Sequence, residues 1–220
     1  HGDFYTFDYG FDFYAPQVMT APDGRCIMIG WMDNWDIPIV EKTSGDGWAC
    51  QMTVPRELNF KNGKIISTPI KELENLRTGG KSYRNLNITG ETQLDGVNGN
   101  VGELVINADT TQSFQIKLRC SADEETVLAY DKATNKFCVN RDKSGEGAGG
   151  ISEVQLAPSD NLKLQIFMDK SSVEVFLNDG EAVISTRIYP KETSQGIVFV
   201  PSGQFKINSL DFYNLEQGLE

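Results

Sequence analysis

Residues 172–189, SVEVFLNDGEAVISTRIY, decide the fold that this sequence predicts. Two apolar runs flank Asn178-Asp179-Gly180, and these residue types readily take the positive φ angles of tight hairpin turns. Side chains of the first run alternate between two strand faces, one with Val173, Val175 and Leu177 and the other with Glu174 and Phe176. The stretch therefore predicts a β-hairpin with one face in a core, and it leaves Phe176 to pack elsewhere.

Short runs of the same kind recur along residues 81–220. They read GELVINAD, SFQIKLRC, ETVLAYD, KFCVNRD, LKLQIFMD, GIVFVPS and KINSLDFYNL, with Asn, Asp, Gly and Ser between them. This spacing is typical of two packed antiparallel sheets. The Gly-rich stretch 144–153 is expected to be a flexible loop, and it does not predict a phosphate loop because no Lys-Ser/Thr follows it. With 21 Gly and 8 Pro, the chain is predicted to be all-β.

The first 69 residues predict a smaller set of strands joined by tight turns. Asp23-Gly24 separates two apolar runs, so it predicts a hairpin whose two turn residues have positive φ, and Asn62-Gly63 predicts a second turn. The segment 70–77, IKELENLR, has apolar residues at helical spacing, namely Ile70, Leu73 and Leu76. We expect a linker helix in 70–80 that ends at Gly79-Gly80.

Charge and composition exclude several classes of partner. The net charge is −11 and the pI about 4.6, and no basic stripe is present, so a nucleic-acid partner is not expected. Apolar runs are too short to span a membrane. No metal or other cofactor is expected, because the cysteines lack ligand spacing and the one histidine is residue 1. The chain opens without Met in strand-like sequence, so we expect the natural polypeptide to begin upstream; its location, cytoplasmic or secreted, is not indicated.

The four cysteines are Cys26, Cys50, Cys120 and Cys138. Cys120 and Cys138 lie on neighbouring predicted strands, so a disulfide between them is one interpretation. Free buried thiols are the preferred interpretation, because an unpaired Cys behaves as a small apolar side chain.

Acidic and aromatic residues alternate in the stretch 10–35. Asp12 and Asp33 lie within apolar, aromatic strands, where a carboxylate is costly unless it is paired or faces a wet cavity. Asp12 shares a strand face with Tyr14, and Asp33 shares one with Trp31 and Trp35 if GWMDNW is extended. Acids beside aromatic rings suit a sugar site, and acids at the rim beside ordinary core aromatics are the alternative. Asp8 is a further candidate of the same kind.

Two other groups of charges have structural interpretations. Arg56 and Glu57, in VPRELN, indicate an ion pair or strand-end contacts rather than a catalytic pair. The NRD sequence at 140–142 indicates the end of a sandwich strand.

Four segments together resemble one known family. They are DYGFDFYAPQ (8–17), DGRCIMIGWMDNW (23–35), GWACQMTVPREL (47–58) and SSVEVFLNDGEAVISTRIYP (171–190). They resemble glycoside hydrolase family 32, the β-fructosidases, and they occur in the order of that family. The resemblance implies the last blade of a five-bladed β-propeller in 1–69, a linker helix in 70–80 and a β-sandwich in 81–220.

The same resemblance implies an activity and a set of site residues. Family members cleave terminal β-fructofuranosyl bonds of sucrose or fructans with retention of configuration, using acids in motifs of the types N-D-P-N-G, R-D-P and E-C. None of these motifs occurs here, so 1–220 alone is expected to be inactive. Trp35 is implied as the first substrate contact, followed by Asp12 and Tyr14, with Asp33 as a rim acid near the leaving-group sugar. The alternative is a sandwich that binds carbohydrate, or forms oligomers, without catalysis.

An isolated propeller blade would expose apolar surface, because each blade normally packs against a neighbour on both faces. We therefore expect 1–69 to pack onto the sandwich, to pair with a second copy in a homo-oligomer, or to pair with upstream blades.

Overall fold

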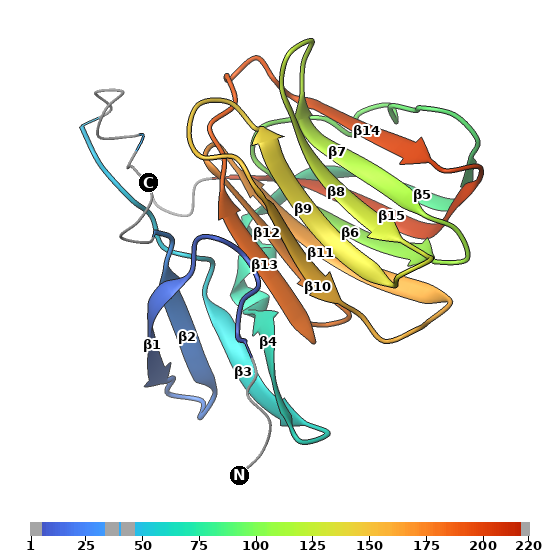
Figure 1. Cartoon of the computed structure of the whole chain (residues 1–220). Helices are drawn as coiled ribbons and strands as arrows, with labels where there is room; N and C mark the ends of the chain where they lie inside the picture. Colours follow the sequence, from blue (N-terminus) through green and yellow to red (C-terminus); the bar gives the residue numbers. More distant parts are fainter. Residues whose placement is uncertain (1–5, 34–39, 41–46, 217–220) are drawn as a thin grey trace.

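The computed structural model describes residues 6–33, 40 and 47–216, and it consists of two β units that lie against each other (Figure 1). The first unit is a four-stranded antiparallel sheet with the order β1-β2-β3-β4. Its strands are β1 (Tyr14–Thr20), β2 (Cys26–Trp31), β3 (Arg56–Lys61) and β4 (Lys64–Pro69). A short 3₁₀ helix, η1 (Lys71–Leu76), leads from it to the second unit.

The second unit is a sandwich of a six-stranded and a five-stranded sheet. The six-stranded sheet has the order β13-β12-β11-β6-β15-β5, and the five-stranded sheet has the order β10-β9-β8-β7-β14. The strands are β5 (Arg77–Ile88), β6 (Gly102–Asp109), β7 (Phe114–Cys120), β8 (Glu125–Asp131), β9 (Lys136–Lys143), β10 (Ile151–Gln155), β11 (Asn161–Asp169), β12 (Ser172–Leu177), β13 (Ala182–Arg187), β14 (Gly196–Pro201) and β15 (Phe205–Leu215). The predicted all-β class is confirmed.

The main core lies between the two sheets of the sandwich. Val173, Val175 and Leu177 of β12 are buried in it, as their alternation predicts. Phe176 points to the opposite face and packs with Phe167 and Val183 in a separate apolar cluster. Because that cluster lies on the outer face of the six-stranded sheet, the sheet buries apolar side chains on both sides at this end.

The predicted hairpins form, although one turn differs from expectation. Asn62 and Gly63 have φ angles of 52° and 78°, which confirms the turn predicted between β3 and β4. At the β1–β2 turn only Gly24 has a positive φ, 88°, and its amide donates to the carbonyl of Ala21 at 2.9 Å. That pattern is a type I turn closed by a left-handed glycine, so the prediction of positive φ at Asp23 was wrong.

The linker is shorter than predicted and of a different helix type. Ile70, Leu73 and Leu76 recur every three residues, which is the period of a 3₁₀ helix rather than an α-helix. The helix ends at Leu76, and Gly79-Gly80 lie inside strand β5 instead of terminating it. The sandwich therefore begins at Arg77, within the segment expected to be linker.

Two edge strands were not predicted from the sequence. In β5 only Ile88 is buried, so its sequence lacks the alternation that identifies a half-buried strand. Strand β10, which lies in part of the expected flexible loop 144–153, buries only Ser152 and Val154 and pairs with β9. Both strands lie at sheet edges, where the hydrophobic pattern is weakest.

Cys26, Cys50, Cys120 and Cys138 are all free, each partly buried, so the preferred interpretation of free thiols is confirmed. Across the described ranges, no helix has the length and apolarity needed to cross a bilayer.

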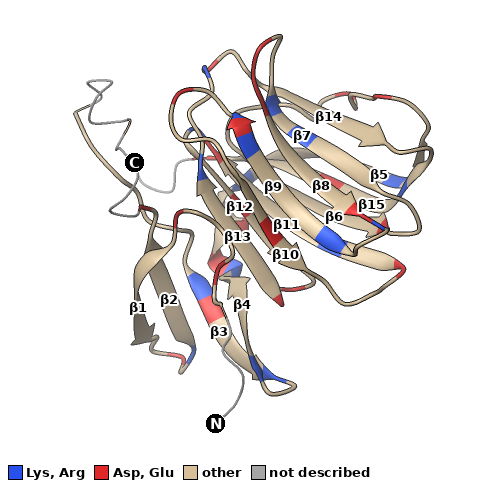
Figure 2. Cartoon of the chain, viewed as in Figure 1, with Lys and Arg blue, Asp and Glu red and all other residues tan. Residues whose placement is uncertain are grey.

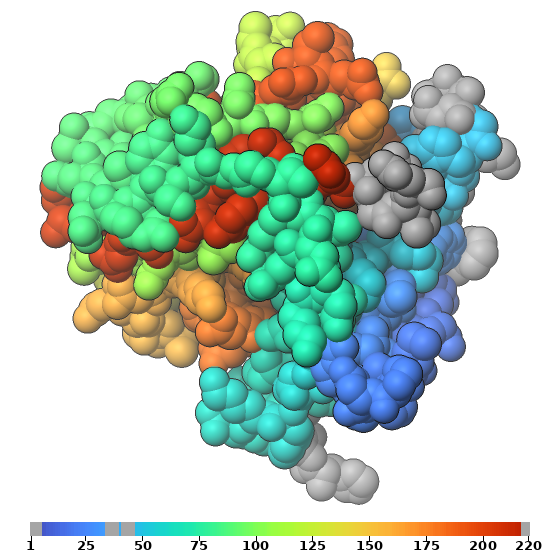
Figure 3. All heavy atoms as spheres, turned by 180° about the vertical axis from the view of Figure 1, so that it is seen from behind, coloured from blue at the N-terminus to red at the C-terminus, as the bar shows by residue number. Residues whose placement is uncertain are grey.

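The four-stranded unit covers the β13 edge of the sandwich, which confirms the expectation that it packs onto that domain (Figures 1 and 3). The amides of Tyr9 and Asp12 donate to the carbonyls of Val183 and Ser185 at 2.8 and 3.3 Å. These bonds occupy backbone acceptors that an edge strand otherwise leaves open to association. The view from behind in Figure 3 shows the η1 region lying where the two units meet.

Replacing Gly180 by Ala should destabilise the protein more than replacing Gly63. Both glycines have similar φ angles, 83° and 78°, so each alanine should cost about 1–2 kcal/mol for the left-handed backbone. A Cβ at Gly180 would also lie 2.2 Å from the carbonyl oxygen of Ser67 across the contact between units, whereas a Cβ at Gly63 meets nothing within 4 Å. Urea unfolding of the two variants measures the difference. Equal losses of unfolding free energy would contradict the close contact.

Candidate functional site

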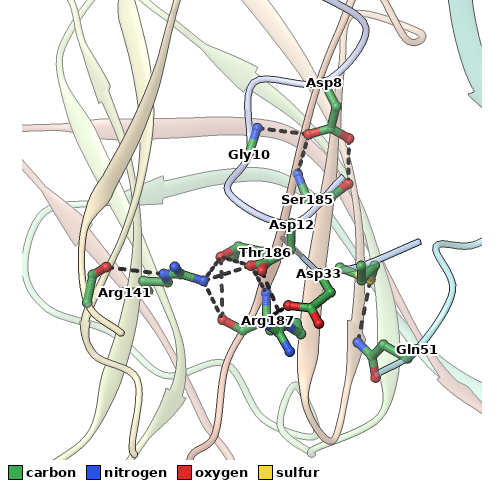
Figure 4. Close-up of polar contacts among 11 residues, drawn as sticks. Asp8, Gly10, Asp12, Asp33, Gln51, Arg141, Ser185, Thr186 and Arg187 are labelled. Carbon is green, nitrogen blue, oxygen red and sulfur yellow. Dashed lines mark hydrogen bonds and ion pairs between the residues drawn. The ribbon is translucent and has the colours of Figure 1, made fainter. Parts of the chain in front are cut away.

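Charged side chains fill the surface between the two β units. Asp8, Asp12 and Asp33 enter from the first 69 residues, and Arg141, Glu174 and Arg187 enter from the sandwich. Figure 2 shows charged positions on β12, β13 and β9 at this surface, and Figure 4 shows the contacts. These residues form two clusters, one around Arg56 and one around Arg187.

The first cluster surrounds Arg56, which begins β3 and is completely buried. Its guanidinium donates to Asp8 at 2.9 Å, to Glu174 at 2.7 Å and to the hydroxyl of Ser185 at 2.6 Å. The rings of Phe13 and Phe176 lie 4.9 and 5.2 Å from the guanidinium carbon. Arg56 thus joins the N-terminal segment, the four-stranded sheet and the sandwich at one point.

Both acids in this cluster have further donors. Asp8 accepts hydrogen bonds from the amide of Ser185 at 2.9 Å and from its hydroxyl at 2.7 Å. The other oxygen of Glu174 accepts the amide of Val54 at 2.7 Å. Every carboxylate oxygen of the two acids accepts a hydrogen bond, and these bonds compensate for part of the free-energy cost of burying the acids.

The second cluster is centred on Arg187 at the end of β13 (Figure 4). Its Nε donates to Asp12 at 3.1 Å, and its Nη2 donates to Asp33 at 2.7 Å. Asp12 also accepts from Arg141 at 2.7 Å and from the amide of Arg187 at 2.7 Å. The thiol of Cys50 lies 3.2 Å from the second oxygen of Asp33.

Burial and pairing act in opposite directions on these groups. Burial raises the pKa of Glu174, while Arg56 opposes the rise, and burial lowers the pKa of Arg141, while Asp12 opposes the fall. Burial also acts to lower the pKa of Arg187, but Asp12, Tyr189 and Asp33 together outweigh it and the pKa is raised. Because a guanidinium keeps its charge in proteins, each buried arginine needs the acids beside it to offset the cost of its burial.

Asp12 and Asp33, two of the expected substrate contacts, are buried and paired with the sandwich, and their contact with a sugar stays a prediction. Their side chains are 0% and 2% exposed, and their oxygens are bonded to arginines of the sandwich. For acids in such strands the sequence allowed pairing or a wet cavity, and the structure shows pairing with arginines for both.

The two aromatic candidates have different outcomes. Tyr14 is 47% exposed, and its ring lies edge-on to that of Trp31 with the centroids 6.2 Å apart. Its contact with substrate stays a prediction. Trp35, the first of the expected substrate contacts, lies outside the described residues.

Sequence reasoning singled out Arg56 and Asp8 without pairing them, and it identified only the acid in the pairs of Asp12 and Asp33. Arg56 does have the structural role that was predicted, but with Asp8 and Glu174, whereas Glu57 lies 3.6 Å from Arg25. Glu174, Arg141 and Arg187 were not singled out as interface residues. The available signal was a charge within an apolar strand, which Glu174 in VEVFL shows most clearly, on the same face as Phe176.

The acids buried between the two units are all engaged in ion pairs. Retaining hydrolysis of a glycoside needs two carboxyl groups about 5–5.5 Å apart beside the scissile bond. The acids buried between the two units are instead held by arginines. No group of three metal-binding side chains occurs among the described residues.

A cavity of about 580 Å³ lies beside η1, with Val54, Leu73, Phe167 and Leu215 among its lining residues.

Comparison with known families assigns the chain. Residues 1–69 match the model of the glycosyl hydrolases family 32 N-terminal domain, and residues 72–214 match that of the family 32 C-terminal domain. The chain belongs to glycosyl hydrolase family 32. The boundary between the two matched regions coincides with η1, where the structure joins its two β units.

Several family 32 enzymes are similar to the chain in sequence. Sucrose-6-phosphate hydrolase of Staphylococcus xylosus is 38% identical over 202 residues, which are 90% of this chain and 40% of that protein. Raffinose invertase of Escherichia coli is 38% identical, with 88% and 40% covered. Levanase of Bacillus subtilis is 33% identical, with 96% and 34% covered. The chain thus spans about two fifths of the length of these curated relatives.

Solved structures of the family have the same fold. Sucrose-6-phosphate hydrolase from Lactobacillus gasseri superposes with a TM-score of 0.83 at 24% identity, covering 97% of this chain and 43% of that one. A β-fructofuranosidase of Bombyx mori superposes with a TM-score of 0.78 at 28% identity, covering 96% and 42%.

Replacing Arg56 by Met should lower the free energy of unfolding by about 3–5 kcal/mol, because it leaves Asp8 and Glu174 buried without their counter-ion. The matched control is Arg84→Met, which removes an arginine that is 53% exposed and pairs with Asp211. That change should cost less than about 1 kcal/mol. Urea denaturation of both variants tests the prediction. Similar losses in the two variants would contradict the role assigned to Arg56.

Proposed function

We propose that this chain is the C-terminal part of a retaining glycoside hydrolase that cleaves terminal β-fructofuranosyl bonds in sucrose or fructans. The observation that carries the proposal is the order of the two family matches, 1–69 and 72–214, on two β units joined by a buried ionic surface. The names of the relatives support the substrate class, since they include hydrolases of sucrose 6-phosphate, an invertase and a levanase.

In this proposal, the four-stranded unit is the last blade of a five-bladed propeller, and the catalytic acids lie on upstream blades. Those acids act by forming and then hydrolysing a covalent fructosyl-enzyme intermediate. The side of the pocket that contacts the substrate is called the substrate wall below, and the present chain supplies Trp35 and Tyr14 to it. Asp12 and Asp33 support that wall from behind, because their oxygens are bonded to the sandwich.

The partner of the exposed blade surface is proposed to be the rest of the propeller. Strand β1 is exposed along its whole length and forms the edge of its sheet, with Val18 and Met19 61% and 62% exposed. Phe60 of β3 is 77% exposed. Apolar side chains on an open sheet edge favour pairing with another β segment. When the upstream blades are absent, the same surface is open to a second copy, and sedimentation velocity of purified 1–220 measures that association.

Purified 1–220 should not hydrolyse sucrose, sucrose 6-phosphate, raffinose, inulin or levan, because it lacks the catalytic acids. The activity should appear when residues 1–220 replace the matching part of the Staphylococcus xylosus sucrose-6-phosphate hydrolase. In that hybrid, Trp35→Ala should lower kcat/KM by at least about tenfold, because it removes a substrate contact. Trp48→Ala, a change at a tryptophan that is 49% exposed, is the matched control and should leave kcat/KM nearly unchanged.

Three outcomes would contradict the proposal. Hydrolysis by 1–220 itself would place catalytic groups in this chain. A folded hybrid without activity would argue against its role in a β-fructosidase. Specific binding of glycans to 1–220, without activity in the hybrid, would favour the non-catalytic carbohydrate-binding alternative.

A further inference from the structure

We infer that Arg187 of the sandwich is a positioning residue for the substrate wall. It binds Asp12, close to Tyr14, and Asp33, close to Trp31, and so fixes the relative position of these two rings. The inference rests on the proposed function in taking Tyr14 as a substrate contact. Its structural part, the placing of the Tyr14 ring by Arg187, can be tested separately.

Arg187 holds two separate strands of the blade with one guanidinium. Its side chain is 1% exposed, and it donates to Asp12 at 3.1 Å and to Asp33 at 2.7 Å. Asp12 lies two residues before Tyr14 of β1, and Asp33 lies two residues after Trp31 of β2. Because Tyr14 and Trp31 are paired across these strands, Arg187 holds both strands at the same end.

The backbone at this end needs external support. Ala15 has a φ of 44°, which is unusual for a residue with a side chain, and the β1–β2 register shifts between Tyr14 and Gln17. A bulge of this kind re-aims the neighbouring side chain, and strained backbone persists only where its surroundings hold it. Two residues anchor the chain just before the bulge: Phe13, whose ring packs on Arg56, and Asp12, through its ion pairs. The direction of the Tyr14 ring therefore depends in part on the ion pairs of Asp12.

Arg141 holds Asp12 from the other sheet of the sandwich. It donates to Asp12 at 2.7 Å, and its guanidinium carbon lies 4.2 Å from the centre of the Phe11 ring. Gly150 lies so close to Phe11 that an added Cβ would be 2.7 Å from the ring. The chain before Tyr14 is therefore packed against both sheets, and only the Asp33 contact is specific to Arg187.

The planar fork of arginine accounts for this double attachment. A guanidinium presents donors in several fixed directions and can bond to two carboxylates, whereas the ammonium of lysine is a compact charge on a flexible stem. The geometry at Arg187 uses Nε for one strand and Nη2 for the other. A lysine at position 187 could balance part of the charge but could not hold both strands in the same way.

The direct test uses NMR of the full 1–220 chain with labelled aromatic residues. Wild type should show a nuclear Overhauser effect between the rings of Tyr14 and Trp31, whose centroids are 6.2 Å apart. Arg187→Met should abolish it, and Arg187→Lys should restore it only in part. Asp33→Asn keeps the size of the side chain, so it is the variant to use if Arg187→Met does not fold. It should weaken the nuclear Overhauser effect between the two rings. Arg84→Met, in the far part of the sandwich, should leave the signal unchanged.

The kinetic test uses the active hybrid described above. There Arg187→Lys should raise KM by about tenfold while kcat changes by less than about threefold, because a misplaced substrate contact affects binding more than chemistry. A general loss of folded protein would instead lower the apparent kcat and leave KM unchanged.

The outcomes separate this inference from the proposed function. Retention of the Tyr14–Trp31 signal in folded Arg187→Met or Asp33→Asn would overturn the inference, whether or not the hybrid is active. Loss of the signal together with an inactive hybrid would support the positioning by Arg187 and contradict the proposed function. An unchanged KM in the Arg187→Lys hybrid would overturn the functional part of the inference.

Discussion

The buried pairing of arginines with acids from the opposite unit is the constraint on which the rest of the structure depends. Arg56 belongs to the four-stranded sheet and has Glu174 of the sandwich as a counter-ion, while Arg187 belongs to the sandwich and has Asp12 and Asp33 of the blade. Removing one partner of such a pair while the units stay docked leaves a charge unpaired in an apolar surrounding, which costs several kcal/mol. Such pairs add less net stability than hydrophobic contacts would, but they specify one mode of docking.

That docking mode also explains two features of the backbone. The N-terminal segment covers the edge strand β13, with Gly10 so close that an added Cβ would lie 1.8 Å from the carbonyl oxygen of Ser185. The hydroxyl and amide of Ser185 in turn bond to Asp8. The sheet edge is thus satisfied by hydrogen bonds from the other unit, so the sandwich helps to determine the shape of the blade. In the proposed enzyme, this would connect the sandwich to the substrate wall without any contact between sandwich and substrate.

Local sequence patterns predicted the features that depend on neighbouring residues. Alternation in VEVFL placed Val173, Val175 and Leu177 in the core and left Phe176 for a second contact, and Asn62-Gly63 predicted its turn. The ion pairs could not be predicted in the same way, because Arg56 and Glu174 are 118 positions apart and Arg187 and Asp12 are 175 apart. Asp12 and Asp33 were recognised as costly to bury, but the sequence did not say which cations would pair with them. The edge strands β5 and β10 were missed because exposed strands carry little hydrophobic pattern.

Differential scanning calorimetry of purified 1–220 tests the central claim most directly, namely that buried ion pairs make the four-stranded unit and the sandwich one cooperative structure. The account predicts a single unfolding transition whose calorimetric enthalpy equals its van't Hoff enthalpy. Two resolved transitions, or a calorimetric enthalpy well above the van't Hoff value, would show that the units unfold independently and would contradict it.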